Sequence, residues 1–529
     1  MKRVLIFFFL CLFSSLIYAQ FTQFAEGPVF PDPGPGFAKI LQMKNNSTMF
    51  IHVSFTKGLF VHVYEPINKV RTESTIEPAY GTIQQGSVEG IFEINGDAVV
   101  MVSKKDNNET VLYRLIIDGR SGKLKEEKLL ISIKTAWGKT ANSKLVLMPL
   151  PELSVRKDPA SDHYAVATFS NNVADTGKRI EMILFGSDNK EISRGAYSTG
   201  KYKYLQYIDM AVLGGDKVTA LLYGYDVDAE NLRTGELVFA GLGKTSGRIA
   251  AKELDYSNDL VPENGILRYD PTIQQLLLLS TARIKSESNR LETYLGHVDP
   301  NTNMLVTNII IGAGEKLQSG YETIYGRRAN YKGLPQNMVL HNDGTFTIIF
   351  EEMEVLKEKD TASHTILKNT AVVNYTQDGT PTYAYLIPTN QYVSNSSLSP
   401  FYQSSRNFTG QEFLKDKAFK SSVYISDGHR SFLLFNDREA NSKPEFNGKP
   451  LQFKDLGDAD GYYSELIGSD VTLTRKYVFG NPVKSGAEVE HKVGLFTVFD
   501  YDKINNVLVV LKQDKEPGHP GLKLIWFQP

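Results

Sequence analysis

The sequence is nearly without cysteine. Among its 529 residues only Cys11 carries a thiol, and Cys11 lies in the apolar run near the N-terminus. Once that run is removed, no thiol remains for a disulfide, for a metal site or for nucleophilic catalysis. A chain of about 500 residues can bury enough apolar surface to fold without disulfides. The sequence therefore predicts a fold held together by its hydrophobic core alone.

Long apolar runs are also missing after the N-terminus. Lys2 and Arg3 precede the apolar run 4–17, and Ala19 offers a small residue at a cleavage point. This pattern is typical of an export signal and is too short for a membrane span. We therefore expect residues 1–19 to be a signal peptide rather than a membrane anchor. The mature chain should have no transmembrane segment and should lie in the periplasm or outside the cell.

The chain has no excess of charge of one sign, with 58 basic and 60 acidic residues and a net charge of −2. A nucleic-acid partner would require a basic face, so no nucleic acid is expected as a partner. The charge also gives no reason to expect binding to anionic lipid. An envelope protein or a glycan remains as the class of partner.

Helical periodicity is almost absent, whereas short apolar runs separated by Asn, Asp, Gly and Lys recur along the chain. The clearest unit covers residues 90–133. It contains four runs, and the first two are separated by the hairpin signal Asn95-Gly96-Asp97. The unit predicts four antiparallel strands joined by tight turns, of which the second is fully buried.

The buried second strand is the feature by which the unit can be followed along the chain. It recurs eight times, at 49–53, 98–102, 164–169, 218–223, 275–280, 345–350, 431–435 and 507–511. The spacing exceeds that of a usual repeat of about 40–50 residues, and insertions near 351–365 and 438–462 account for the excess. We expect both insertions to project from the fold rather than to extend its strands. The first is dense in charge and cannot bury enough apolar surface to join the core.

The last unit offers only three strands before the chain ends, at 495–500, 507–511 and 522–527. An unpaired edge would invite aggregation. The simplest remedy is that the mature N-terminus, near 20–24, supplies the fourth strand and closes a ring.

This order of strands resembles a β-propeller over nearly the whole mature chain, and in general character it resembles the exported propellers of bacterial envelopes. The resemblance implies an all-β fold with one propeller domain, residues 20–529, built of four-stranded antiparallel blades. Eight blades are expected by strand count, with seven as the alternative, and a β-sandwich array or a β-helix remains open. No repeated WD, kelch or Asp-box signature identifies a functional family.

The stretch 238–249, VFAGLGKTSGRI, contains the Gly-Lys-Thr end of a phosphate-binding loop. A true phosphate loop has a glycine at the position of Val238 and a helix after the threonine. Here the stretch lies between the third and fourth strands of one unit. It therefore predicts a hairpin turn, and no nucleotide or other cofactor is expected.

Metal ligands do not form a convincing set. Asp458 and Asp460 precede Gly461 as in a calcium loop, but the first and twelfth positions of that loop are not carboxylates. Asp226-Val-Asp228-Ala-Glu230 lacks the glycine. His52 and His62 lie on neighbouring strands, yet a catalytic zinc site needs a third ligand. We expect no metal site, while a structural calcium ion between blades remains open.

No catalytic signature is visible. Gly-x-Ser-x-Gly is absent, and sixty acidic residues cannot be sorted into the carboxylate pair of a glycosidase. The entry strands 39–43 and 90–94 are mostly apolar, which favours binding over catalysis. The connection 321–331 combines aromatic and cationic side chains that suit a recognition surface. Its candidate partner-binding residues are Tyr321, Tyr325, Arg327, Arg328 and Tyr331.

The sequence thus favours a non-enzymatic binding or scaffold protein of the bacterial cell envelope that uses propeller loops as a partner surface. The alternative is an extracytoplasmic glycan-active hydrolase or lyase with its site in the central funnel. A small-molecule sensor is a third hypothesis.

Overall fold

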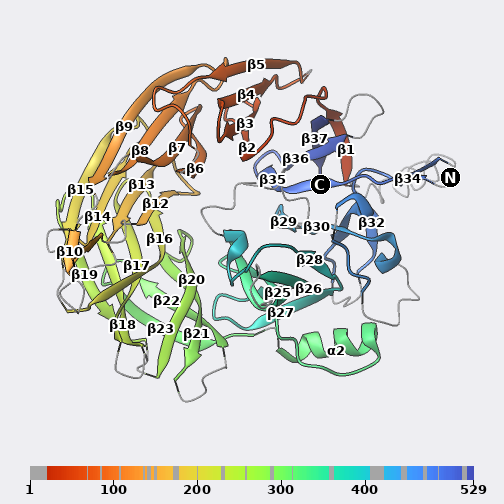
Figure 1. The fold of residues 1–529 in the computed structure, drawn as a ribbon. Coiled ribbons are helices and arrows are strands. Elements are labelled where there is room, and N and C mark those ends of the chain that lie inside the picture. The colour runs from red at the N-terminus through yellow and green to blue at the C-terminus, as the bar shows by residue number, and fades with distance from the viewer. Residues whose placement is uncertain are drawn as a thin grey trace, which may run out of the picture.

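The computed structural model shows a ring of eight antiparallel blades (Figure 1). It describes residues 21–529 with the exception of 68, 84–85, 107–108, 135–136, 140–144, 148–151, 171–177, 199–200, 228–232, 257–258, 286–290, 313, 357–362, 405–421, 443–449, 455, 469–472, 486–487 and 515–520. The expected signal peptide lies outside the described residues.

Each blade is numbered by its place in the chain, and its strands are given from the inner to the outer edge. Blades 1 to 4 consist of β2 (Gly36–Gln42), β3 (Thr48–Ser54), β4 (Gly58–Tyr64) and β5 (Arg71–Ile76); β6 (Gly86–Ile94), β7 (Asp97–Asp106), β8 (Glu109–Ile117) and β9 (Leu124–Lys134); β12 (Glu152–Lys157), β13 (Tyr164–Phe169), β14 (Ile180–Phe185) and β15 (Glu191–Tyr197); and β16 (Tyr204–Leu213), β17 (Lys217–Val227), β18 (Arg233–Gly243) and β19 (Ile249–Leu254).

Blade 6 has a fifth strand, and blade 8 takes its outer strand from the start of the chain. Blades 5 to 8 consist of β20 (Leu260–Asp270), β21 (Gln275–Ile284), β22 (Leu291–Asp299) and β23 (Met304–Ile310); β24 (Leu334–Leu340), β25 (Phe346–Leu356), β26 (His364–Tyr375) and β27 (Pro381–Ile387), with β28 (Gln391–Val393) beside β26; β29 (Val423–Ser426), β30 (Ser431–Asp437), β31 (Asp460–Glu465) and β32 (Arg475–Tyr477); and β35 (Gly494–Asp502), β36 (Val507–Asp514), β37 (Gly521–Gln528) and β1 (Thr22–Glu26).

Few elements lie outside the blades. They are the hairpins β10 (Trp137–Lys139) with β11 (Leu145–Leu147) and β33 (Val483–Ser485) with β34 (Glu488–Glu490), the helix α2 (Gly314–Tyr325), and the 3-10 turns η1 (Tyr402–Ser404), η2 (Glu439–Ser442) and η3 (Leu456–Asp458). Within the described part of the chain, no helix is both long and apolar enough to span a membrane.

The prediction of eight blades is confirmed. Each of the eight apolar runs falls on the second strand of a blade, which is β3, β7, β13, β17, β21, β25, β30 or β36. These runs are apolar on both faces because neighbouring blades pack face to face; every residue of β3, for example, is buried. Eight core clusters join successive pairs of blades around the ring, including blade 8 with blade 1. The alternatives of seven blades, a sandwich array and a β-helix are thereby excluded.

The predicted closure by the N-terminus is confirmed as well. Strand β1 pairs antiparallel with β37, so the first and last strands of the chain share blade 8 (Figure 1). Lys523 on β37 forms an ion pair with Glu26 on β1. Phe30 continues the pairing, since its N–H donates to the Leu522 carbonyl at 2.9 Å and its carbonyl accepts from the Leu522 N–H at 2.8 Å.

The two insertions depart in part from the expectation. The first was expected not to extend the strands, which is wrong for its described residues: β25 continues to Leu356, and Val355 pairs with Thr365 on β26. The physical reason is that β28 covers the extended part of β26 and that Leu367 and Val393 bury apolar surface there. The second insertion forms no strand before β31 in its described part, and Phe453 bridges to Gln391 on β28.

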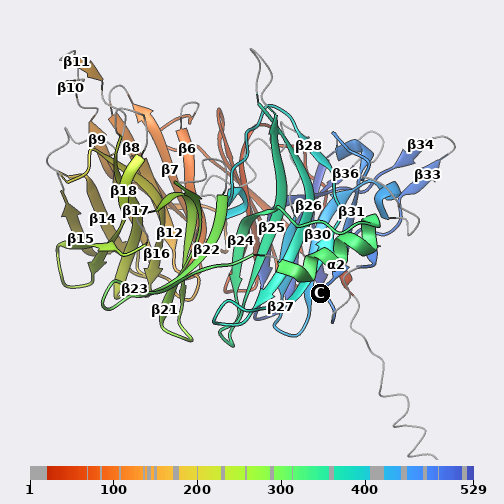
Figure 2. The ribbon, with the colours of Figure 1, turned by 90° about the horizontal axis from the view of Figure 1, so that it is seen from below.

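Helix α2 lies on the outside of the ring beside β27 (Figures 1 and 2). Its residues Leu317 and Tyr321 are buried and lie four positions apart, so one face packs inward. Gly326 ends the helix with φ of +67°, and its N–H donates to the Glu322 carbonyl at 2.9 Å. The segment 321–331 was expected to be a connecting loop, but its first five residues, 321–325, form the last part of α2.

Candidate functional site

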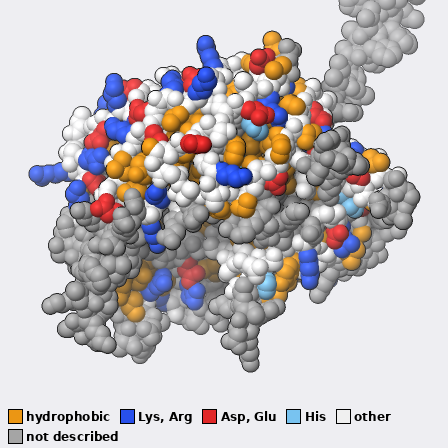
Figure 3. Space-filling model, turned by 45° about the horizontal axis from the view of Figure 1, so that its top comes forward, with side chains coloured by type: hydrophobic (Ala, Val, Ile, Leu, Met, Phe, Trp, Pro, Cys, Tyr) orange, Lys and Arg blue, Asp and Glu red, His pale blue; other side chains and the backbone are white. Residues whose placement is uncertain are grey.

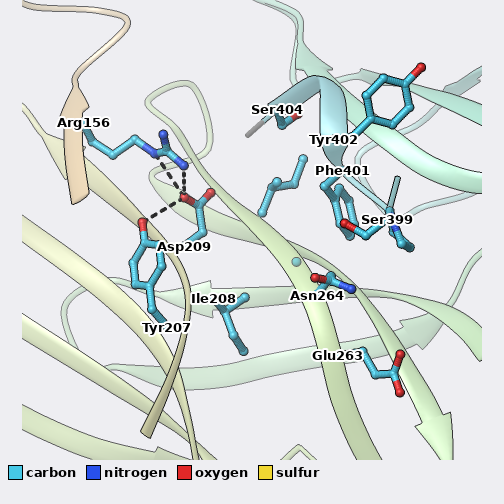
Figure 4. A pocket seen from close by; sticks show the side chains of 13 residues that line it. Arg156, Tyr207, Ile208, Asp209, Glu263, Asn264, Ser399, Phe401, Tyr402 and Ser404 are labelled. Carbon is cyan, nitrogen blue, oxygen red and sulfur yellow. Dashed lines mark hydrogen bonds and ion pairs between the residues drawn. The ribbon is translucent and has the colours of Figure 1, made fainter. Parts of the chain in front are cut away.

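A cavity of about 290 Å³ opens on the inner side of blades 3, 4 and 5. Its walls come from the inner strands β12, β16 and β20 and from residues 399–404, which we call the strap. Figure 4 shows Arg156, Tyr207 and Asp209 on one side and the strap on the other. The lining residues are Arg156, Tyr207, Ile208, Asp209, Glu263, Asn264, Gly265, Ile266, Ser399, Pro400, Phe401, Tyr402 and Ser404. We call this cavity the axial pocket.

Bulges in the inner strands shape this wall. The register of β16 shifts between Tyr207 and Asp209, and that of β20 shifts between Pro262 and Asn264. A bulge inserts one residue, bends its strand and re-aims the side chains around it. Three consecutive side chains of β16, from Tyr207 to Asp209, therefore line the pocket rather than alternate away from it.

Asp209 is the centre of the polar side of the pocket and is only 1% exposed. Its Oδ1 accepts from Arg156 Nε at 3.0 Å, and its Oδ2 accepts from Arg268 Nη1 at 3.1 Å. The backbone N–H of Leu267 also donates to Oδ2, at 2.9 Å. One carboxylate from blade 4 thus holds two guanidiniums, one from blade 3 and one from blade 5.

The charges around Asp209 set its ionisation. Burial favours the neutral acid and raises its pKa, but the neighbouring Arg156 and Arg268 outweigh burial and hold the pKa of Asp209 below its usual value. Asp209 is therefore an anion at neutral pH, and its oxygens accept from the two arginines, from the Leu267 N–H and, at 3.4 Å, from the Tyr207 hydroxyl.

Both guanidiniums keep further N–H groups. A guanidinium has five N–H donors, and Asp209 receives those on Nε and Nη2 of Arg156. Arg268 directs Nη1 to Asp209 and to the Leu267 carbonyl. Among the described residues, no partner is seen for Nη1 of Arg156 or for Nε and Nη2 of Arg268. The two side chains are 22% and 24% exposed.

Glu263, the second carboxylate of the lining, is also paired. It lies at the bulge of β20 and forms an ion pair with Arg283 of β21. Its backbone carbonyl accepts from Gln206 Nε2 at 2.9 Å. Each of the two carboxylates that line the pocket is thus held by at least one guanidinium, and of these guanidiniums Arg156 belongs to the lining.

The strap reaches the pocket from blade 6 and is fastened by hydrogen bonds. The Phe401 N–H donates to the Pro335 carbonyl at 2.9 Å, and Ser404 Oγ donates to Asn337 Oδ1 at 2.8 Å. Phe401 itself has φ of +63°, which a non-glycine residue adopts only at a cost. The surrounding contacts therefore fix the strap in a conformation that it would not favour alone.

Tyr402 anchors the strap from behind the pocket. Its ring points away from Arg156 (Figure 4), and its hydroxyl donates to Glu351 Oε2 at 2.5 Å. Glu351 is 4% exposed, and burial raises its pKa to about 8. The carboxyl of Glu351 is therefore largely protonated at neutral pH.

The candidate residues of the connection 321–331 lie elsewhere, on and after α2 at the outside of the ring (Figure 1). The three tyrosines converge on Asn369 and Glu352: Tyr321 donates to Glu352 Oε1 at 2.5 Å, Tyr325 to Asn369 Oδ1 at 2.6 Å and Tyr331 to the Asn369 carbonyl at 2.9 Å. Arg327 and Arg328 are exposed, and Arg328 lies 3.3 Å from Glu322.

The other candidates are occupied by structural contacts. The Gly-Lys-Thr stretch joins β18 to β19 as a hairpin, as predicted. Burial lowers the pKa of His52 and of His62 to about 4, so both are neutral, and His52 Nε2 lies 3.0 Å from the Gly34 carbonyl. Asp460 accepts from the Lys492 N–H at 2.7 Å. Among the described residues, no three His, Cys, Asp or Glu side chains lie together as metal ligands would.

Sequence reasoning missed Arg156, Asp209 and Arg268. The expectation of mostly apolar entry strands was based on residues 39–43 and 90–94, which correspond to β2 and the end of β6. The charged side chains Arg156, Asp209 and Arg268 lie instead on the inner strands β12, β16 and β20. One signal in the sequence could have pointed to this cluster, because Asp209 stands within an otherwise apolar run. A carboxylate buried in such a strand needs a partner of opposite charge. Basic and acidic side chains are interspersed on the face that Figure 3 shows, so the described residues of that face give no further pointer.

No protein-family model matches the chain, and no curated protein is similar to it in sequence. Solved structures resemble it in fold at low identity. An ulvan lyase is 8% identical over 86% of this chain and 98% of its own, with a TM-score of 0.38. The propeller domain of the trilobed protease from Pyrococcus furiosus is 8% identical over 68% and 96%, with a TM-score of 0.30. A prolyl endopeptidase is 11% identical over 91% and 55%, with a TM-score of 0.40. Likeness at this level says nothing about function.

Proposed function

We propose that the chain is a non-enzymatic binding protein that takes its ligand in the axial pocket. One observation supports the proposal above all: both carboxylates that line the described pocket, Asp209 and Glu263, are held by guanidiniums. A general acid or base must exchange a proton with the substrate, and a carboxylate committed to an ion pair is poorly suited to that. Arg156, which lines the pocket and is 22% exposed, is in contrast a cationic donor of the kind that binding sites use.

The proposed setting is the bacterial cell envelope. It rests on the N-terminal signal expected from the sequence. The inner strands and the strap would hold the ligand. The exposed Arg327 and Arg328, with the tyrosine cluster beneath them, remain a proposed second contact for an envelope protein.

A glycan-active hydrolase or lyase is the second candidate, and Glu351 favours it. A carboxyl group with a pKa of about 8 is protonated at neutral pH, as a general acid must be. However, Glu351 is 4% exposed and lies behind Tyr402, whose ring points away from the pocket (Figure 4). A catalytic role would require the strap to move.

The test is ligand capture with a blocked pocket. The purified protein is incubated with soluble glycan and peptide fractions of a bacterial envelope, and retained molecules are identified by native mass spectrometry. Asn264→Trp fills the pocket, and Asn301→Trp in the exposed turn between β22 and β23 is the matched control. We expect capture by the wild type and the control only. Equal capture by Asn264→Trp would refute the site, and cleaved glycan in the mixture would favour the enzyme.

A further inference from the structure

We infer that two copies of this chain pair through strand β23, antiparallel and edge to edge, so that blade 5 of one copy continues into blade 5 of the other. The inference is independent of the axial pocket, because β23 is the outer strand of its blade (Figure 1). It is carried by the composition and exposure of β23, by the backbone groups that the strand leaves open and by a comparison with the other outer strands.

Strand β23 carries no charged side chain. Residues 300–314, which include the whole strand, contain no Lys, Arg, His, Asp or Glu. The outer strands β1, β5, β9, β15, β19 and β32 each contain at least one charged residue. Strand β27 has none, but helix α2 packs beside it. Charges and covering elements protect exposed edges against association. In the described part of the chain, β23 is thus the outer strand that has neither protection.

The side chains of β23 present apolar surface to solvent. Met304, Val306 and Ile310 are each more than half exposed, and Ile309 is exposed as well. No other strand in the described part of the chain has as many exposed large apolar side chains. Single exposed hydrophobic residues are ordinary, whereas a group of them on one strand is typical of an interaction surface.

The outer edge of β23 also leaves backbone groups open. The Ile311 N–H donates to the Thr293 carbonyl on β22 at 2.9 Å. Because the backbone groups of successive residues point to opposite edges of a strand, those of Asn308 and Ile310 point away from β22. Within the described residues, β23 pairs with β22 alone. The register of that pair shifts at Val306, so the regular open edge begins after this residue.

A second copy is the partner that this edge fits. A two-fold axis at Ile309 places Asn308 opposite Ile310 of the second copy, so that the open N–H and C=O groups of the two positions meet. The opposite strand has to be uncharged, because a charged side chain would lose hydration against the apolar surface. Strand β23 itself meets this condition. Such a contact uses the same surface on both copies and closes at a dimer, which leaves no open edge on blade 5.

Sedimentation velocity on the full chain tests the inference, and we expect the wild type to sediment as a dimer. Ile310→Lys places like charges on diagonal positions across the axis. Ile310→Pro removes an N–H that β22 does not use, which an edge strand tolerates. Both variants should therefore sediment as monomers. Thr72→Lys, at an exposed position of the outer strand β5, is the matched control and should remain a dimer. Ile310→Lys should also keep the wild-type melting temperature, since its site is exposed.

A single cysteine tests the register of the pairing. Cys11 is the only cysteine of the chain, so Cys11→Ser supplies a background without thiols. At the proposed axis, Ile309 faces its own copy with about 4.5 Å between the Cα atoms, which is within the range of a disulfide. Ile309→Cys should therefore give a disulfide-linked dimer under mild oxidation. Thr307→Cys, two positions from the axis, is the control and should not.

Three results overturn the inference: a wild type that is monomeric at every concentration, a dimer that persists in both Ile310 variants, or a dimer that Ile309→Cys links no better than Thr307→Cys. A monomeric protein that captures a synthetic peptide of residues 303–312 would also overturn self-pairing. It would indicate that a strand of another protein occupies the edge.

Discussion

Trp526, on the last strand of the chain, donates its indole N–H to the hydroxyl of Thr48 in blade 1, 3.0 Å away. Its ring is 1% exposed and lies edge-on to Tyr64, with the ring centres 5.3 Å apart. Strand β37 therefore takes part in two connections: it pairs with β1 within blade 8, and its side chains share a core with blade 1. The ring is closed by packing as well as by strand pairing.

Deletion of residues 20–30 should lower the melting temperature. The deletion leaves the edge of β37 unpaired and removes Phe30, which is 2% exposed. Loss of a buried phenylalanine alone costs about 3–5 kcal/mol, and the lost strand adds to it. Differential scanning calorimetry measures the effect. Phe24→Ala, at a site 50% exposed, is the control and should change little. A truncated protein that melts with the wild type would show that closure does not depend on β1.

The blades could be predicted from the sequence because blade packing leaves a simple signal. A strand buried on both faces has no polar side, so β3 and its seven equivalents appear as continuous apolar runs. The count of such runs gave the number of blades. The missing fourth strand of the last unit then required β1, since an unpaired edge in a closed ring is unfavourable.

The axial pocket could not be predicted in the same way. Asp209 meets Arg156 and Arg268 only when three blades, separated by more than fifty residues along the chain, are set side by side. The bulge in β16 also shifts its register by one residue, and no pattern in the sequence marks that shift. The strap comes from blade 6, so its place opposite blade 4 follows from the ring and not from local sequence.

The Gly-Lys-Thr hairpin offers a second prediction. Lys244 is exposed, and its backbone N–H donates to the Asp216 carbonyl at 2.8 Å, a bond that does not depend on the side chain. Lys244→Ala should therefore leave the free energy of unfolding within about 0.5 kcal/mol of the wild-type value. It should also leave ligand capture unchanged. Saturable ATP binding by the wild type that the substitution abolishes would show that the stretch is a phosphate site.

In the segment 321–331, the exposed arginines are expected to contact a partner, whereas the tyrosines are expected to stabilise the fold. Arg327 and Arg328 are exposed, so the double substitution to alanine should weaken capture of an envelope protein by about 1–3 kcal/mol without changing the fold. Tyr321→Phe, in contrast, leaves Glu352 without the hydroxyl that now donates to it at 2.5 Å, and should lower stability by about 1 kcal/mol. Surface plasmon resonance and thermal melts distinguish the two effects. Full capture by the arginine double variant would remove this surface as a contact.

Glu351 provides the last prediction, which concerns pH. Burial raises its pKa to about 8, well above its ordinary value of 4.5. Between these values the folded protein holds a proton that the unfolded chain has lost, so stability falls as pH rises from about 5 to about 8. The fall is at most roughly 1.4 kcal/mol per pH unit.

Glu351→Gln keeps an acceptor for Tyr402 and removes the titration, so its melting temperature should match the wild type near pH 5 and exceed it at pH 9. Glu354→Gln, exposed on the same strand, is the control. Parallel melting curves of wild type and Glu351→Gln across this range would show that Glu351 is ionised throughout.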